Sequence, residues 1–275
     1  MRLFPFLFNI YYFSHSLFFR NSIISKPNNN NNNIIDSCNF IELNKDKEFY
    51  NKKKLITISP GGYKGFYTHG ICSYIKQKYN LNNYLFSGAS AGAWNALFMT
   101  CKKDFSLSSK YIIENLTKNT KNIFELQNKV KEIILNQYTS DDFELDKLFI
   151  GVTTLHGFKF KTTIYSNFCN LEDAIDCCFA SSHIPFVTGN LLNKYKNIIS
   201  FDGGFSKNPY FDSIESDFHI SPGIWEVNTK NNILTLENIT TLFSKDKYDC
   251  NQLLIDGFND ANNHKEFLDS IFLSK

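Results

Sequence analysis

The sequence predicts an α/β protein, a three-layer α/β/α sandwich built on a mainly parallel central sheet. Short apolar runs rich in β-branched residues alternate with longer segments of helical periodicity, which is the pattern of strands joined by crossover helices. Glycine and proline clusters separate these runs and mark the turns. Hydrophobic residues make up 43% and charged residues 20% of the 275 residues, so the chain has enough apolar surface for an ordinary core.

The N-terminal segment, residues 1–52, differs from the rest. Leu3–Phe19 is almost entirely apolar and aromatic, lies between Arg2 and Arg20, and is short and interrupted for a membrane span. No small-residue cleavage site follows it. It is therefore open whether this segment associates with a membrane, directs targeting or is incidental, and we expect a membrane-associated or cytoplasmic protein. Six consecutive asparagines, Asn28–Asn33, indicate a polar linker.

The folded unit is expected over residues 53–217, with 218–275 as a strand and helix extension packed on it. The first elements are a strand at Leu55–Ser59, a helix at Phe66–Tyr79, a strand at Tyr84–Ser87 and a helix at Ala91–Cys101. Further along, the pattern predicts helices over Ser106–Leu116 and Ile123–Tyr138, a hairpin of Phe149–Leu155 with Phe158–Tyr165, a helix at Leu171–Phe179, a strand at Ile198–Phe201 and two helices after Tyr248.

Charge and cysteine content exclude several classes of function. Twenty-nine Lys and Arg against 27 Asp and Glu give a formal net charge of +2, which argues against nucleic acid as the partner. The seven cysteines are an odd number and include no Cys-x-x-Cys pair, which argues against a disulfide scaffold and a zinc site. We expect no metal and no organic cofactor.

The segment Gly88–Gly92, Gly-Ala-Ser-Ala-Gly, matches the Gly-x-Ser-x-Gly nucleophile elbow. A predicted strand precedes it and a predicted helix follows, which is the context that this motif requires. The sharp turn forces the serine into a strained backbone conformation that small neighbours tolerate. Ser90 is therefore the predicted nucleophile, and the amide of Ala91 at the helix N-terminus is aimed at the reaction centre.

A glycine-rich loop, Pro60–Gly65, lies between the first strand and the first helix. No Lys-Ser or Lys-Thr pair follows it, as a phosphate-binding Walker loop requires. Beside a serine elbow on the next strand, the loop is predicted to supply the N–H donors of an oxyanion hole. A simple turn remains the alternative. Because Pro60 has no N–H, the donors would be Gly61 and Gly62.

The serine needs a base. Asp202-Gly203-Gly204 directly follows the predicted strand Ile198–Phe201, which puts the carboxylate at a strand's carboxyl end, where α/β folds place ligands. Asp256 lies in an amphipathic helical stretch and is predicted to be at the surface. Among the six histidines, His183 and His219 are the only ones considered as an alternative base, although a lone histidine is commonly structural.

In these motifs the sequence resembles the patatin-like phospholipases, lipid acyl hydrolases with a Ser–Asp dyad and no catalytic histidine, over approximately residues 53–215. Pro60–Gly65 resembles the family's oxyanion loop, Gly88–Gly92 its elbow and Asp202–Gly204 its Asp-Gly-Ala/Gly box. The segment Ala180–Pro185 is similar to the family's Ala-Ser-x-x-Ile-Pro segment, which favours a structural His183. The family's loop usually begins Asp-Gly-Gly-Gly or Gly-Gly-Gly, and Pro60 departs from that pattern.

The resemblance implies a phospholipase A-like hydrolase that cleaves carboxylic esters of phospholipids or glycerolipids, with a membrane surface as partner and an oligomeric state left open. The implied site residues are the nucleophile Ser90, the base Asp202, the oxyanion donors Gly61, Gly62 and Ala91, and the motif residues Lys64, Gly65, Gly88, Gly92, Gly203 and Gly204. Two alternatives stay open: an inactive lipid-surface binding protein, and an acyltransferase or triad esterase on another α/β hydrolase fold.

Overall fold

The computed structural model describes residues 50, 52–103, 116, 119–226 and 243–273. The seven strands are β1 (Lys54–Ile58), β2 (Tyr84–Ala89), β3 (Leu148–His156), β4 (Lys159–Tyr165), β5 (Asn193–Tyr195), β6 (Ile198–Phe201) and β7 (Phe218–Ile220). The α-helices are α3 (Gly65–Lys78), α4 (Ala91–Thr100), α6 (Ile123–Gln137), α7 (Leu171–Ser181), α9 (Cys250–Asn263) and α10 (Lys265–Phe272). The predicted helix Ser106–Leu116 lies outside the described residues, apart from Leu116, as does the segment Leu3–Phe19.

The seven strands form one sheet in the order β5-β6-β3-β2-β1-β7, with β4 paired to β3. The neighbours β3, β2, β1 and β7 run parallel, whereas β4, β5 and β6 pair antiparallel. The predicted fold class, a mixed α/β sandwich with a mostly parallel sheet flanked by helices, is confirmed. Strand β5 was not predicted, and the strand expected within residues 218–275 was not assigned to particular residues, because three residues are too few for a periodic pattern.

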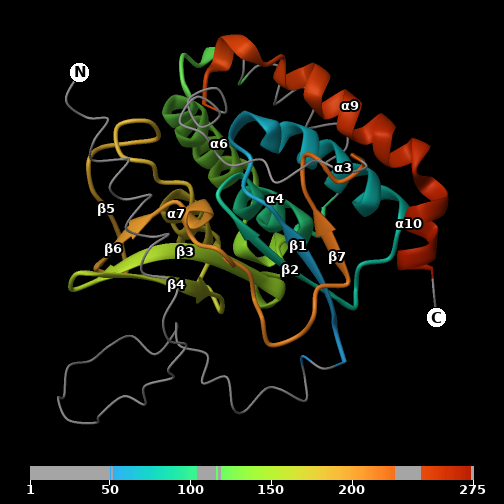
Figure 1. Cartoon of the computed structure of the whole chain (residues 1–275), viewed down its shortest axis with the longest axis horizontal. Coiled ribbons are helices and arrows are strands. Elements are labelled where there is room, and N and C mark those ends of the chain that lie inside the picture. Colours follow the sequence, from blue (N-terminus) through green and yellow to red (C-terminus); the bar gives the residue numbers. More distant parts are fainter. Residues whose placement is uncertain (1–49, 51, 104–115, 117–118, 227–242, 274–275) are drawn as a thin grey trace.

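Alternate residues of the parallel strands pack on opposite faces of the sheet. Ile56, Phe86 and Ile150 belong to the large core that the helices cover, with α3 and α4 above the strands in Figure 1. Leu55, Leu85 and Phe149 lie on the other face, in a cluster with Tyr50 and Phe211.

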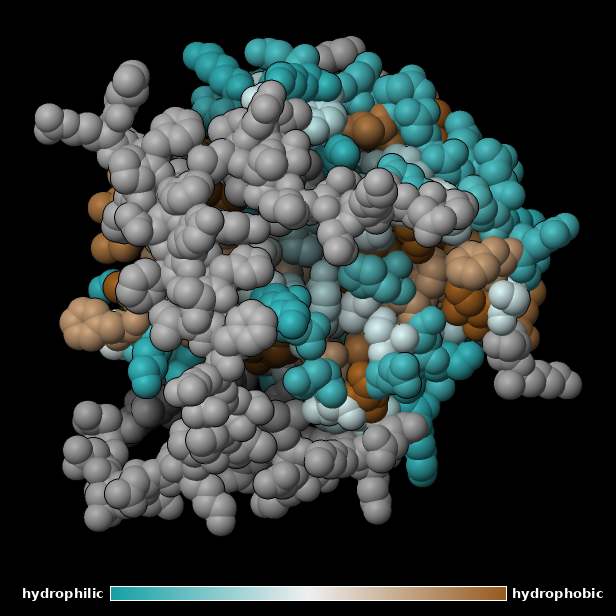
Figure 2. All heavy atoms as spheres, in the orientation of Figure 1, coloured by the Kyte–Doolittle hydropathy of each residue, from teal (hydrophilic) through white to brown (hydrophobic). Residues whose placement is uncertain are grey.

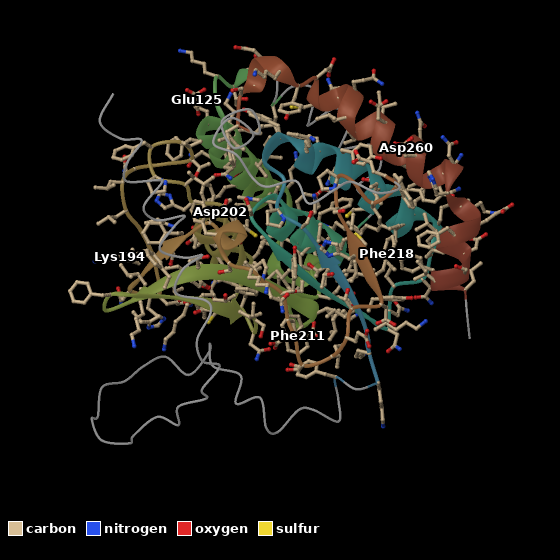
Figure 3. All side chains as sticks on the ribbon, in the orientation of Figure 1. Glu125, Lys194, Asp202, Phe211, Phe218 and Asp260 are labelled. Carbon is tan, nitrogen blue, oxygen red and sulfur yellow. The ribbon has the colours of Figure 1, made fainter. Side chains whose placement is uncertain are left out.

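Tyr50 lies in the N-terminal segment, residues 1–52, which was expected to lie outside the folded unit, yet Tyr50 is only 6% exposed. Its ring contacts the rings of Phe149 and Phe211 edge-on, with centroids 5.8 Å and 5.3 Å apart. Figure 3 shows Phe211 below the sheet, on the side away from α3. The folded body therefore includes Tyr50.

The C-terminal helix α9 packs on α3, as Figure 1 shows, and α10 contacts α9. Helices α3 and α9 approach closely at Gly70 and Gly257, where a Cβ on Gly257 would lie 2.0 Å from the Tyr67 carbonyl oxygen. Gly257 is thus buried at a helix crossing, although the neighbouring Asp256 was predicted to be at the surface. The outer face of α9 is hydrophilic in Figure 2. No helix in the described ranges is long and apolar enough to span a membrane.

Candidate active site

Strand pairing explains how Ser90 and Asp202 meet. Strand β4 occupies one edge of β3 along residues 150–156, so β2 and β6 share the other edge. Strand β2 runs parallel to β3 and ends with Ala89 opposite Gly151, whereas β6 runs antiparallel and ends with Phe201 opposite Thr153. The two strands therefore approach each other head-on, and the residues that follow them, Ser90 and Asp202, meet at the centre of the sheet.

Ser90 has the strained backbone that the elbow motif predicts. Its φ is 54° and its ψ is −126°, and it immediately precedes α4. The turn is tight enough to exclude side chains at the flanking glycines, because a Cβ on Gly88 would lie 2.1 Å from the Gly92 carbonyl oxygen, and a Cβ on Gly92 would lie 2.1 Å from the Ile58 carbonyl oxygen. Both glycines are therefore required for the turn to lie against β1.

The Ser90 hydroxyl donates a hydrogen bond of 2.6 Å to Asp202 Oδ2. The other carboxylate oxygen, Oδ1, accepts the Gly204 N–H at 2.7 Å. Both residues are buried, with exposed fractions of 3% for Ser90 and 4% for Asp202, and Figure 3 shows Asp202 in the interior. The Ser90 hydroxyl and the Asp202 carboxylate are therefore in direct contact, out of bulk water.

Burial raises the pKa of Asp202 to about 6, although the hydrogen bonds from Ser90 and Gly204 lower it in part. A carboxyl group with its ordinary pKa is a weak base, and the raised value makes Asp202 a better proton acceptor near neutral pH. The Asp202 carboxylate is therefore suited to accept a proton from the Ser90 hydroxyl.

The backbone around this pair is held by further buried hydrogen bonds. The Ser90 N–H donates to Ser181 Oγ at 2.8 Å, and Ser181 Oγ donates to the Gly151 carbonyl at 2.7 Å. The Asp202 carbonyl accepts from Thr153 Oγ1 at 2.9 Å. Ser181 was known from sequence only as part of a family-like segment, and nothing in the sequence linked Thr153 to the site.

The side chain of neither candidate histidine hydrogen bonds Ser90 or Asp202. His183 gives its backbone carbonyl to the Asp202 N–H at 2.7 Å, while its ring hydrogen bonds the Leu191 backbone. His219 on β7 places Nδ1 2.8 Å from Thr57 Oγ1. Burial lowers the pKa of both rings. Within the described part of the chain, no histidine ring hydrogen bonds Ser90 or Asp202.

The glycine loop faces the same site. Gly62 has a φ of 51° and lines a cavity of about 190 Å³ together with Gly65, Ser90 and Ala91. Gly61 is buried and does not line the cavity. Of the predicted oxyanion donors, the structure therefore brings Gly62 and Ala91 to the cavity beside Ser90.

Lys64 and Pro60, which belong to the same loop as these glycines, differ in where they lie. Lys64 is exposed and lies away from the cavity. Pro60 instead packs against the aspartate box, because a Cβ on Gly204 would lie 3.1 Å from the Pro60 ring and 2.9 Å from Asp202 Oδ1. Gly203 is equally confined, with a Cβ there 2.2 Å from the Gly151 carbonyl oxygen. The two glycines let the Asp202 segment pack against β3 and the loop.

The cavity is also lined by the polar residues His69, Asn95, Gln127 and Ser182, and the rest of its wall is apolar, which suits a hydrocarbon chain. Its apolar side chains come mostly from α4 and α6 and comprise Phe66, Trp94, Leu97, Phe98, Leu116, Ile123, Leu126, Val130, Ile133, Ile134, Tyr138, Phe143 and Phe243. Sequence reasoning did not find this wall, because an apolar face of α6 that lines a cavity looks the same as one that packs in the core.

The described residues contain no group of three or more His, Cys, Asp or Glu side chains arranged to hold a metal ion. The six cysteines among them are free thiols.

A scan against family models matches residues 56–213 to the patatin-like phospholipase family, Patatin. The matched segment covers more than half of the chain and includes the glycine loop, the elbow and Asp202. The chain therefore belongs to the patatin-like phospholipase family, whose members are lipid acyl hydrolases. A search of curated proteins found no match.

Proposed function

We propose that this protein hydrolyses carboxylic esters of phospholipids or glycerolipids with a Ser90–Asp202 dyad. The observation that carries the proposal is the 2.6 Å hydrogen bond from Ser90 Oγ to the buried Asp202 carboxylate. Family membership supports a lipid acyl hydrolase, and the apolar cavity beside Ser90 supports an acyl chain as the bound group.

In the proposed mechanism, Asp202 accepts the Ser90 proton as Oγ attacks the ester carbonyl carbon. The N–H groups of Gly62 and Ala91 stabilise the negative charge on the carbonyl oxygen. Collapse of the tetrahedral intermediate expels the alcohol, which takes the proton from Asp202. A water molecule then attacks the acyl-serine and gives a proton to Asp202, and collapse releases the fatty acid and returns the proton to Ser90 Oγ.

The test combines a fluorophosphonate probe with a panel of phospholipids and glycerolipids. We expect the probe to label the wild-type protein and the Ser87→Ala variant but not Ser90→Ala. Ser87 is a matched control because it is a buried serine on β2, the strand that precedes Ser90, where its hydroxyl accepts the Phe211 N–H. Labelling of Ser90→Ala would refute the nucleophile, and an unlabelled wild-type protein would favour an inactive lipid-binding protein.

We also propose that Leu3–Phe19 attaches the protein to a membrane interface, which its aromatic and apolar composition favours. Deletion of residues 1–48 keeps Tyr50 and its contacts with Phe149 and Phe211. The truncated protein should keep its activity on dispersed short-chain esters and bind liposomes more weakly. Equal liposome sedimentation of the two proteins would refute the anchor.

A further inference from the structure

Asn95 links α4 to the start of α3, the two elements beside the proposed oxyanion hole. It lies on α4, five residues after Ser90, and is 4% exposed. Its Nδ2 donates to the Gly65 carbonyl at 3.0 Å and to Thr68 Oγ1 at 2.8 Å, and its Oδ1 lies 2.9 Å from His69 Nδ1. Each polar atom of the Asn95 side chain therefore bonds to the first turn of α3.

The orientation of this amide is determined by its neighbours. Thr68 Oγ1 donates its only proton to the Gly65 carbonyl at 3.0 Å, so it accepts from Asn95, which requires Nδ2 at that position. Oδ1 consequently accepts a proton from His69 Nδ1. Burial lowers the pKa of His69 to about 4, so the ring is neutral at physiological pH and carries its one proton on Nδ1.

Gly65 is the point at which the glycine loop becomes α3, and it also touches the elbow directly. A Cβ on Gly65 would lie 2.6 Å from the Ala91 Cβ. The proposed oxyanion donors are divided between these two elements, with Gly62 on the loop and Ala91 at the start of α4. The geometry of the oxyanion hole therefore depends on how the loop sits against α4.

We propose that Asn95 is a positioning residue that sets the glycine loop against the first turn of α4 and so fixes the oxyanion hole. This inference rests on the proposed hydrolase function. It assigns Asn95 no contact with the reacting atoms: its amide acts through Gly65 and Thr68. A displacement of about 1 Å at a reaction centre lowers turnover about 100-fold, so a small shift of the loop has a large kinetic effect.

The first experiment measures hydrolysis of a short-chain ester by Asn95→Leu, which keeps the branching at Cγ and removes the three hydrogen bonds. We expect kcat to fall about 10- to 100-fold, with KM within about twofold of the wild-type value. Thr68→Val should lower kcat by a smaller factor. Thr68 does not line the cavity, so Thr68→Val tests the position of the loop without changing a substrate contact. Thr68→Val also replaces Asn95→Leu if Asn95→Leu fails to fold.

The matched control is Thr100→Val. Thr100 is fully buried on the same helix, where its hydroxyl donates to the Leu97 carbonyl at 2.8 Å and makes no link to the glycine loop. We expect it to lower the free energy of unfolding about as much as Thr68→Val does, since each substitution removes one buried hydroxyl group, and to leave kcat unchanged. Equal loss of kcat in Thr68→Val and Thr100→Val would overturn the proposal.

A second readout compares an ester with its thionoester, in which sulfur replaces the carbonyl oxygen. Sulfur is a weak hydrogen-bond acceptor, so the oxyanion hole contributes less to its hydrolysis. The kcat of Asn95→Leu should therefore fall more for the ester than for the thionoester. If the wild-type enzyme is active and Asn95→Leu loses the same factor of kcat on the ester and the thionoester, only the positioning role is refuted. A wild-type protein that is inactive on all esters would instead refute the proposed function.

Discussion

Ser181 and Ser182 are adjacent at the end of α7, yet their hydroxyl groups serve two different regions of the molecule. Ser181 Oγ accepts from the Ser90 N–H and donates to Gly151, within the hydrogen-bonded reaction centre around Ser90 and Asp202. Ser182 Oγ accepts from Gln127 Nε2 at 2.9 Å and Trp94 Nε1 at 3.3 Å, two residues that line the apolar cavity.

The two regions are stabilised by different interactions. The reaction centre is held by short, directional hydrogen bonds between segments distant in sequence, so a lost partner leaves a buried polar group unpaired. The cavity wall is held mainly by apolar contacts of α6, which tolerate changes of similar volume. Substitutions in the reaction centre should therefore act on kcat, and substitutions in the wall should act on KM and chain-length preference.

The largest expected effect is the loss of the base. Asp202→Asn should lower kcat/KM on any ester by about 10³- to 10⁴-fold, because the amide accepts no proton from Ser90. The control is Asp217→Asn, which alters a carboxylate that accepts the Leu55 N–H at the opposite end of β1. Steady-state kinetics of both variants check this, and more than a few per cent of wild-type activity in Asp202→Asn would contradict the dyad.

The pH dependence should follow the same carboxyl group. Since the pKa of Asp202 is raised to about 6, kcat/KM should fall about tenfold per pH unit below that value as the carboxylate takes up a proton. A pH–rate profile on a short-chain ester, with circular dichroism at each pH, measures it. A midpoint near pH 4 would mean that burial does not raise the pKa of the base.

Stability should change with pH in the opposite sense. Because the folded-state pKa of about 6 exceeds the ordinary aspartate pKa of 3.8, the folded protein holds the proton more tightly than the unfolded chain. This contribution, up to about 3 kcal/mol, is present below pH 4 and is lost as pH rises through about 6. Urea unfolding should therefore show Asp202→Asn gaining stability relative to wild type over that interval, and a constant difference would contradict it.

The adjacent serines give a smaller and sharper contrast. Ser181→Ala leaves the buried Ser90 N–H unpaired and should lower kcat about tenfold with little change in KM. Ser182→Ala should leave kcat within about twofold and change KM for long-chain esters instead. Measurements of kcat and KM on esters of short and long acyl chains check both predictions. A similar loss of kcat in the two variants would contradict the distinction between the two regions.

The smallest effect is expected in the wall. Val130→Phe should reduce the space for an acyl chain, raising KM for long-chain esters a few-fold and leaving short-chain esters unaffected. Glu132→Phe places the same side chain on the exposed side of α6 and serves as its control. An increase in KM that is independent of chain length would show that this cavity does not receive the acyl group.

Sequence was sufficient for features that a few neighbouring residues determine. The elbow Gly88–Gly92 carries its geometry locally, because a strained serine between small residues has few other uses, and the strand that precedes Asp202 was equally recognisable. What sequence did not provide depends on long-range packing. Nothing near Asn95 or Ser181 indicates a partner 30 or 91 residues away. The antiparallel direction of β6, which sets Asp202 against Ser90, is likewise determined by its pairing with β3.

The head-on meeting of β2 and β6 also bears on when this protein becomes reactive. The hydrogen bond that joins Ser90 to Asp202 spans 112 residues of sequence, and its geometry requires that both β2 and β6 are paired with the same edge of β3. In a nascent or partly folded chain that already contains the complete elbow, Ser90 does not yet contact Asp202 and is no more reactive than any other serine. Reactivity toward a fluorophosphonate should therefore emerge late in refolding, so the folding order itself delays esterase activity until the sheet is complete.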